Sequence, residues 1–307
     1  MSLYNKYRSR KRGGVNMKKV LIGLLLLSAP IALTGCAEAN FIINKNNTRE
    51  IIGIKDKSVK EIKVPKNITS IGVGAFADCK ELEKVTIANS VTTIGAGAFM
   101  DCWKLKSVKL PDNLTRIESS TFSRCLELEE INFPSTLTYI GDEAFAHANT
   151  PVDLVIPEGV TEIGDRAFQW CNNVDTIKIP STVTKIGEQA FSINKGWRYV
   201  DFRANVSTIK AYTFSSVATF VIPKSVKKIE KYSFWNKVEE NEHKAGGLVK
   251  NLFYCGTEEE YNEIEIEEEF NSEGSWYSTT VYYYSETQPT TSGNFWHYGD
   301  NGRAVAW

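Results

Sequence analysis

The sequence predicts a repeat solenoid, a fold in which short units stack in a row and each packs only against its neighbours. The first observation is a six-residue motif in which Ile is followed five residues later by Phe. Seven copies are spaced by 23 residues and an eighth by 20; they are Ile71–Phe76, Ile94–Phe99, Ile117–Phe122, Ile140–Phe145, Ile163–Phe168, Ile186–Phe191, Ile209–Phe214 and Ile229–Phe234. The second observation is a strand-like pattern before every copy. A fixed period of this length is typical of solenoids.

The strand-like segments alternate polar and apolar residues, which is the pattern of a strand with one buried side. In the first segment, Ile62 and Val64 are expected to point inward, and the matching residues of the later segments are apolar too. The segments are Glu61–Pro65, Lys84–Ala88, Ser107–Pro111, Glu130–Pro134, Asp153–Pro157, Thr176–Pro180, Tyr199–Arg203 and Thr219–Pro223. Because successive strands belong to successive coils, we expect them to pair in parallel, about 4.8 Å apart.

The second half of each repeat is expected to lie opposite these strands, as a short extended segment that ends at the motif Ile and a short 3-10 turn. Five copies have Gly directly after this Ile, and we expect that Gly to adopt a positive φ; they are Gly72, Gly95, Gly141, Gly164 and Gly187. Glu118, Lys210 and Glu230 stand there in the other three copies. The motif Phe is expected to point inward, and each buried Phe contributes roughly 1.5–3 kcal/mol.

Four of the six cysteines, Cys79, Cys102, Cys125 and Cys171, share one position of the 23-residue period. The chain has no CxxC and no Cys/His spacing of a metal site, so no metal and no cofactor are predicted. We expect these cysteines to form a ladder of free, buried thiols, in which each acts as a small apolar side chain. A disulfide between neighbouring coils is the alternative.

Residues 1–35 are expected to be a lipoprotein signal peptide with an N-terminal extension. Lys18 and Lys19 precede an uncharged run, Val20 to Leu33, which is shorter than the roughly 20 residues of a membrane-spanning helix and fits a secretory signal. The ending Leu-Thr-Gly-Cys at Cys36 resembles the bacterial lipobox. This resemblance implies a lipidated Cys36 that anchors the chain to a membrane in the bacterial cell envelope, on the extracytoplasmic side. An ordinary signal peptide with an incidental Cys36 is the alternative.

The other boundaries follow from where the period begins and stops. Residues 36–57 are expected to hold the anchor and an imperfect N-terminal coil that shields the core. The repeats cover 58–235, the polar segment 236–247 is expected to be a loop, and 248–307 is expected to be a C-terminal cap.

The cap is expected to be a small α+β unit. Leu252–Gly256 and Thr280–Tyr284 are strand-like, and Thr257 with Glu260 three residues later is a capping box that starts a short helix. The eight Glu between Glu258 and Glu269 lack the Asp/Asn alternation around a Gly that calcium loops have, so we expect a solvated helix and loop.

The tandem pattern, with Ile-x-Ile-Pro, Val-Thr-x-Ile-Gly, Ala-Phe and Cys at fixed spacing, resembles the BspA-like leucine-rich repeat family of bacterial surface proteins. The resemblance covers about residues 58–235, and the aromatic residues around Trp296 and Trp307 are similar to the C-terminal cap of many such proteins. The family implies a right-handed leucine-rich repeat coil with a parallel sheet. It also implies a surface-attached protein that binds proteins or glycans and has no catalytic residues.

Charge and motifs exclude several functions. Without the first 19 residues the chain has 29 basic and 37 acidic residues, so a nucleic-acid-binding basic face is not expected. The three histidines, His147, His243 and His297, are far apart in sequence, and the chain has no G-x-S-x-G, H-E-x-x-H or phosphate-binding Gly loop. No catalytic residues are therefore predicted, and an uncharacterised hydrolase is kept as the second alternative.

The candidate ligand-binding surface is formed by the outward residues of the strands. It mixes charges and small polar groups, and only Tyr199 is of the type found in binding hot spots. The candidate residues are Lys63, Lys109, Asn132, Lys178, Tyr199 and Asp201. We predict a monomeric, non-enzymatic adhesion or interaction module for an extracellular protein or glycan. The first alternative is a cell-wall or glycan-binding protein that uses the aromatic C-terminal segment.

Overall fold

The computed structural model describes residues 40–194, 197–214, 217–234, 249–267 and 279–307, with the backbone of 236–239 and 242–244. The chain divides into Met1–Cys36 and Ala37–Trp307, and every described residue belongs to the second unit. The predicted signal peptide and Cys36 therefore lie outside the described residues. Within the described part, no helix is long and apolar enough to cross a membrane.

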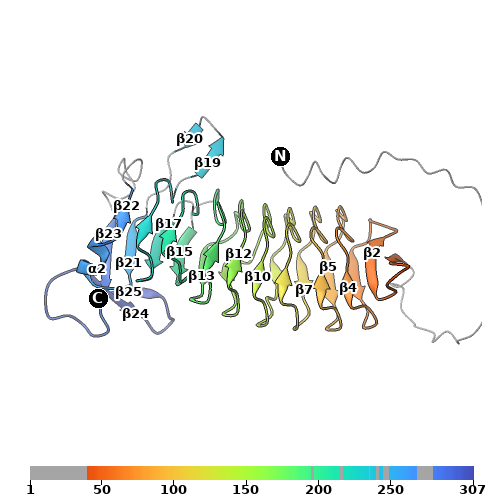
Figure 1. The fold of residues 1–307 in the computed structure, drawn as a ribbon, viewed down its shortest axis with the longest axis horizontal. Coiled ribbons are helices and arrows are strands. Elements are labelled where there is room, and N and C mark those ends of the chain that lie inside the picture. Colours follow the sequence, from red (N-terminus) through yellow and green to blue (C-terminus); the bar gives the residue numbers. More distant parts are fainter. Residues whose placement is uncertain are drawn as a thin grey trace, which may run out of the picture. The chain divides into compact units, whose positions relative to one another are not determined.

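The repeats form a solenoid whose coils have three sides (Figure 1). The first side carries the predicted strands, which are β3 (Glu61–Val64), β5 (Lys84–Ile87), β7 (Ser107–Lys109), β9 (Glu130–Ile131), β11 (Asp153–Val155), β13 (Thr176–Ile179), β15 (Trp197–Phe202) and β17 (Val217–Ile222). They pair in parallel as expected, for example Glu61 with Lys84. The pairing is interrupted once, between β9 and β11, so β3-β5-β7-β9 is one sheet and β11 begins another.

The second side carries strands of two residues that end at the motif Ile: β4 (Ser70–Ile71), β6 (Thr93–Ile94), β8 (Arg116–Ile117), β10 (Tyr139–Ile140), β12 (Glu162–Ile163), β14 (Lys185–Ile186), β16 (Thr208–Ile209) and β18 (Lys228–Ile229). These strands also pair in parallel, and their ladder is interrupted between β6 and β8 and between β14 and β16.

The third side is a series of overlapping turns around the motif Phe. Within a coil, Ala77 N donates to Gly74 O at 3.0 Å, which is the i to i−3 pattern of a 3-10 turn. Between coils, Phe76 N donates to Ala98 O at 2.8 Å. Positive φ angles recur at two repeat positions of this side, so no continuous 3-10 helix forms. The first of these positions holds several residue types along the array: Gly74, Gly97, Ser120, Glu143, Arg166, Gln189, Tyr212 and Tyr232.

The prediction that the Gly after the motif Ile has a positive φ is wrong. Positive-φ Gly residues among those described are Gly74, Gly97 and Gly302. The physical reason for Gly at this position is close contact between coils: a Cβ on Gly95 would lie 2.6 Å from the backbone nitrogen of Val73, and one on Gly141 would lie 2.7 Å from that of Ser119. Gly is therefore needed here because the coils touch, not because of its backbone conformation.

The copies with a larger residue at this position show the consequence. Glu118 follows β8 and Lys210 follows β16, and these are the two strands whose pairing with the preceding coil is lost. Glu230 follows β18, which keeps its pairing with β16; this coil is the one shortened by three residues. A side chain at this position thus coincides with the loss of strand pairing between two full-length coils, which stay bonded on the third side, for example from Gly97 N to Ser119 O at 2.9 Å.

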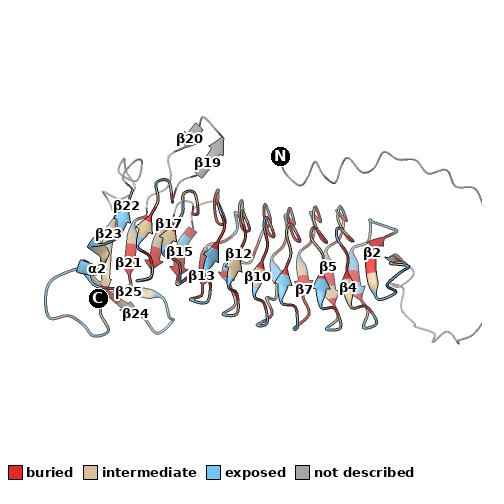
Figure 2. Cartoon of the chain, in the orientation of Figure 1, coloured by how far each residue is buried: buried red, intermediate tan, exposed pale blue. Residues whose placement is uncertain are grey.

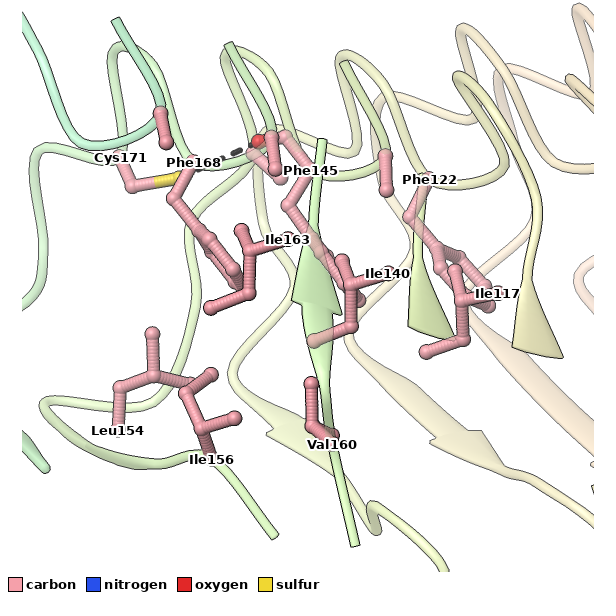
Figure 3. Close-up of a cluster of buried hydrophobic side chains, with 14 of the residues drawn as sticks. Ile117, Phe122, Ile140, Phe145, Leu154, Ile156, Val160, Ile163, Phe168 and Cys171 are labelled. Carbon is pink, nitrogen blue, oxygen red and sulfur yellow. Dashed lines mark hydrogen bonds between the residues drawn. The ribbon is translucent and has the colours of Figure 1, made fainter. Parts of the chain in front are cut away.

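The core runs along the axis of the solenoid (Figure 2). The motif Phe residues stack in a row, with ring centroids 5.4 Å apart for Phe99 and Phe122 and 5.1 Å apart for Phe145 and Phe168. Figure 3 shows part of this row, with the motif Ile residues packed beside it. Since each ring contacts one ring in the coil before and one in the coil after, the row links the repeats in series.

The cysteine ladder is present in the free form. Cys79, Cys102, Cys125 and Cys171 are buried and unbridged. The Cys171 thiol donates to the carbonyl of Phe145 in the preceding coil at 3.2 Å, and Cys125 does the same with Phe99 at 3.3 Å. Burial raises the pKa of both thiols, which keeps them protonated as donors.

The N-terminal end of the core is covered by a β-hairpin. Strands β1 (Phe41–Ile43) and β2 (Glu50–Ile54) are antiparallel, and β2 pairs in parallel with β4. Phe41 is buried and meets the first ring of the row, Phe76, edge-on at 6.0 Å. The hairpin therefore adds one strand to the second side and closes the row of rings.

The C-terminal segment contains the predicted elements. After a hairpin of β19 (Asn236–Glu239) and β20 (Glu242–Lys244), which the sequence did not predict, β21 (Asn251–Tyr254) pairs with β17 and β23 (Thr280–Tyr284) with β21. The helix α2 (Glu258–Asn262) begins with the expected capping box at Thr257, and β22 (Glu265–Ile266) extends the second side beside β18. The coil geometry thus continues beyond the recognisable repeats.

Candidate functional site

The candidate site is the outward face, meaning the solvent side of the first-side strands. Lys63 on β3, Lys109 on β7 and Asn132 after β9 are exposed there, and Lys178 on β13 is half-buried. They lie in coils one, three, four and six of the array, so they form a line along the face and not one cluster. Asn132 also has a structural contact, because its side chain accepts from Leu110 N at 2.8 Å.

Two predicted site residues are covered by the C-terminal tail, residues 285–307. Strands β24 (Phe295–Tyr298) and β25 (Ala304–Ala306) are antiparallel, and β24 pairs with β23. The hydroxyl of Tyr199 accepts from Ala304 N at 2.9 Å, and burial raises the Tyr199 pKa to about 12. Asp201 is only 3% exposed and forms an ion pair with Arg203 at 2.8 Å.

The tail packs through a separate apolar cluster on the outward side of the sheet. Val221, Phe253 and Trp296 form its buried centre, and the Trp296 indole donates to Tyr254 O at 2.7 Å. The Arg203 guanidinium lies 4.6 Å from the ring centre of Tyr298. These contacts hold the tail over β15, β17 and β21. On the earlier strands the tail makes an ion pair between Arg303 and Asp153 of β11, at 3.7 Å. The outward face from β3 to β13 is otherwise largely uncovered, and Lys63, Lys109, Asn132 and Val155 are exposed on it.

The aromatic tail is mostly committed to this packing. Trp296 is fully buried, and Trp307 is 44% exposed and stacked on His297 with ring centres 3.8 Å apart. A sugar therefore has access to the Trp307 ring but not to the Trp296 ring. This arrangement makes the tail a cover for the sheet and leaves little aromatic surface for a glycan.

The interruption between β9 and β11 lies in the middle of the uncovered face. Within the described residues no strand pairing joins the two, although the coils remain bonded before the strands, where Asn149 N donates to Cys125 O at 3.1 Å. Ile131 and Phe133, which the alternation assigns to the core, are only half-buried, unlike every other inward residue of these strands. The sheet therefore has a gap here, not merely a weak pairing.

Pro151 stands where the chain enters the gap. In the three preceding coils a buried Leu occupies this position, and its N–H donates to the carbonyl of the ladder cysteine at 3.1–3.3 Å; these are Leu82, Leu105 and Leu128. Proline has no N–H and fixes its φ, and it also forces the residue before it to be extended. Within the described residues, Val174 of the next coil does not make this turn bond either, yet β13 pairs with β11, so the fixed backbone at Pro151 is the feature that sets this coil apart.

The gap opens into a cleft of about 650 Å³, which is lined by Ile131, Phe133, Pro151, Leu154, Val155 and Lys178 among others. This volume falls in the range of ligand-binding clefts. Val155 is 56% exposed and occupies the outward position that other coils fill with Lys63, Thr86, Lys109 or Lys178. The sequence analysis missed this cleft, and the signal that marks it is Pro in the repeat position of a core Leu.

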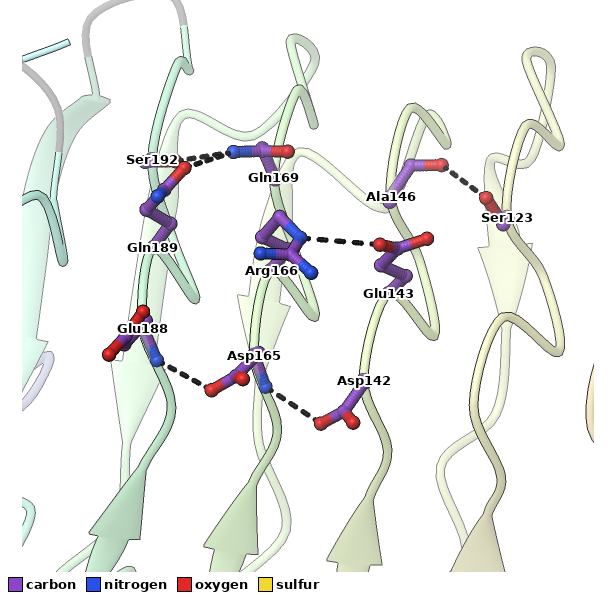
Figure 4. A network of polar contacts seen from close by, with 10 residues as sticks. All are labelled: Ser123, Asp142, Glu143, Ala146, Asp165, Arg166, Gln169, Glu188, Gln189 and Ser192. Carbon is purple, nitrogen blue, oxygen red and sulfur yellow. Dashed lines mark hydrogen bonds and ion pairs between the residues drawn. The ribbon is translucent and has the colours of Figure 1, made fainter. Parts of the chain in front are cut away.

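Polar side chains on the edge between the second and third sides form ladders of their own (Figure 4). Asp142 accepts from Asp165 N at 2.9 Å, and Asp165 accepts from Glu188 N at 2.8 Å. Arg166 and Glu143 form an ion pair at 3.2 Å. Because these carboxylates accept backbone N–H groups of the next coil, they hold the coils together. Among the described residues no group of three His, Cys, Asp or Glu could hold a metal ion.

The comparisons agree with the architecture. The family model for the BspA type leucine rich repeat region, in six copies, matches residues 54–152 and 150–243. The chain therefore belongs to the BspA-type leucine-rich repeat family of bacterial surface proteins. A search of curated proteins finds no match.

Solved structures with a similar fold are bacterial leucine-rich repeat proteins. One from Bacteroides ovatus is 20% identical, with 80% of this chain and 70% of that chain covered and a TM-score of 0.52. The T. pallidum leucine rich repeat protein is 25% identical, with 52% and 82% covered and a TM-score of 0.42. The likeness to the B. ovatus protein supports the fold alone.

Proposed function

We propose that the chain is a lipid-anchored protein of the bacterial cell envelope that binds an extracellular ligand, a protein or a glycan, without catalysing a reaction. The observation that carries this proposal is the largely uncovered outward face from β3 to β13, which the tail contacts through the Arg303–Asp153 ion pair, whereas it covers the same face over the later strands. The face presents Lys63, Lys109, Asn132 and the cleft to solvent. Membership of a repeat family whose members act as interaction modules supports the same role.

A binding array of extracellular-matrix proteins and glycans, probed with the purified chain, tests this function. We expect at least one ligand to bind, and to bind the Lys109→Glu variant several-fold more weakly, because reversing a charge in an interface repels a complementary ligand. Lys66→Glu is the matched control, since Lys66 is exposed in the turn after β3 and makes the same charge change off the face. Two results would contradict the proposal: the chain binds no ligand of the array, or Lys66→Glu weakens binding as much as Lys109→Glu does.

The anchor is proposed from the lipobox alone. Cys36→Ala is expected to move the chain from the membrane fraction to the soluble fraction, because two or more acyl chains supply the anchoring energy and one chain is marginal. Fractionation followed by immunoblotting measures this, and Cys255→Ala, which leaves the lipobox intact, is the control. Retention of Cys36→Ala in the membrane fraction would show that the chain is held there by something else.

A further inference from the structure

The two strands that border the gap have free edges facing each other. Thr176 N donates to Val152 O and Ile156 N to Lys178 O, at 3.1 and 3.0 Å, so these groups of the β11 chain face β13. Because backbone groups alternate in direction along a parallel strand, the N–H and C=O groups of Asp153 and Val155 face the gap. On β9, the bond from Glu130 N to Lys106 O at 2.9 Å likewise leaves the N–H and C=O of Ile131 directed at the gap.

The gap is closed at both ends, so it is a defined groove. Before the strands, Asn149 N is bonded to Cys125 O. After them, the coils approach so closely that a Cβ on Gly159 would lie 2.8 Å from Leu137 O. Between these two points the neighbouring coils stay apart, although β10 and β12 on the second side remain paired. The two coils are therefore joined on the second side and at both ends of the groove, while the edges of β9 and β11 do not pair with each other.

The sides of the groove are mainly apolar, although Ser135, Asp153, Glu158 and Lys178 also line the cleft. Ile131 and Phe133 form one wall, and Leu154 and Pro151 contribute to the other. On the outward rim, Val152 and Val155 are 50% and 56% exposed. Unpaired strand edges beside apolar surface are unfavourable in water, and natural proteins usually protect them with charges or cover them.

We propose that this groove binds an extended peptide segment of a partner protein. The segment pairs its main chain with the free edge of β11 and places one apolar side chain in the cleft between Ile131, Phe133 and Leu154. Main-chain pairing with a strand edge gives affinity, while the pocket for an alternate side chain gives specificity. This inference rests on the proposed function and names its ligand class. A peptide matches the row of backbone donors and acceptors beside the apolar walls, and the polar residues of the lining, Ser135, Asp153, Glu158 and Lys178, can contact its polar side chains.

Phage-displayed random dodecapeptides, selected on the purified chain and then synthesised, test the proposal. Pro151→Leu restores the core Leu of the other coils and its N–H, and is expected to close the gap without unfolding the protein. We expect this variant, and Val155→Lys, to bind the selected peptides at least about tenfold more weakly, or about 1.4 kcal/mol. Two control variants leave the groove unchanged. Val174→Leu changes the repeat position of Pro151 in the next coil. Thr86→Lys introduces the same side chain as Val155→Lys at the equivalent position of β5, which is paired on both sides. Both are expected to bind like the wild type.

A second readout separates pairing from simple apolar contact. When the peptide is N-methylated at one residue at a time, we expect binding to be lost at every second residue. We also expect the backbone amide hydrogens of Asp153 and Val155 to exchange with solvent more slowly in the complex. Selected peptides that bind Pro151→Leu as tightly as the wild type, no selected peptide at all, or a dimer of the chain that Val155→Lys abolishes, would each overturn the proposal. If array ligands still bind under any of these outcomes, the interaction function stands and only the peptide groove is lost.

Discussion

Gly95→Ala is expected to lower the free energy of unfolding by about 2–3 kcal/mol, the range for forcing extra atoms into a packed interior. The added Cβ would lie 2.6 Å from the backbone nitrogen and 2.9 Å from the Cα of Val73 in the preceding coil. Backbone atoms cannot rotate away as a side chain can, so the two coils must separate. Urea unfolding followed by circular dichroism measures the loss.

Gly97→Ala is the matched control in the same coil. Gly97 has a φ of +63°, but a Cβ there would meet nothing closer than Met100 Cβ at 3.8 Å. The left-handed conformation costs about 1–2 kcal/mol, and Ser120 and Glu143 tolerate it at the same repeat position. Replacing Gly with Ala also recovers about 0.5–1 kcal/mol, because the unfolded chain loses conformational freedom. We therefore expect a net loss of about 1 kcal/mol or less for Gly97→Ala. Equal losses for the two variants would refute the close-contact explanation.

Phe168→Ala is expected to destabilise the chain by about 3–5 kcal/mol, the usual cost of deleting a buried Phe ring. The ring is fully buried and stacks on Phe145 and Phe191, with centroids 5.1 and 5.5 Å away. Its loss leaves a cavity in the middle of the array that neither neighbour can fill, because each is held by the next ring in the row. The same unfolding measurement applies.

Trp103→Ala provides the comparison with a larger but exposed ring. Trp103 is 41% exposed. The Lys80 ammonium lies 4.0 Å from its ring centre, and its indole N–H donates to Asp101 Oδ1 at 3.2 Å. A cation–π contact at such a site is worth about 0.5–1 kcal/mol and a hydrogen bond about as much, so we expect a loss of about 1–2 kcal/mol. If Phe168→Ala costs no more than Trp103→Ala, the row of rings is not what holds the coils together.

The repeat made most of the fold predictable. A strict 23-residue period fixes which residues face inward, so the strands, the Phe row and the thiol ladder followed from counting positions such as Val85, Phe99 and Cys102. The helix at Thr257 was predictable because a capping box is a local signal. The Gly after the motif Ile was misinterpreted, since close contact between coils and a positive φ both favour Gly, and only the coordinates distinguish them.

The candidate site was only partly predictable. Alternation places Tyr199 and Asp201 on the outward side of β15, but it contains no information about what lies over them, and the tail that covers them comes about a hundred residues later. Trp296 was expected in a cap over the end of the core, yet it packs on the outward side of the sheet. The gap beside Pro151 was missed because a pattern of apolar residues treats Pro and Leu alike at this repeat position.

The three interruptions of the strand ladders have a mechanical consequence for the array. They fall at different coil junctions: β6/β8 and β14/β16 on the second side, and β9/β11 on the first. At each junction the other strand side stays paired, and the third side keeps bonds such as Glu143 N to Asp165 O at 2.8 Å. We expect the solenoid to bend more easily at these three junctions, and in different directions, because the unpaired strands lie on different sides. Each junction nevertheless stays bonded on its other two sides.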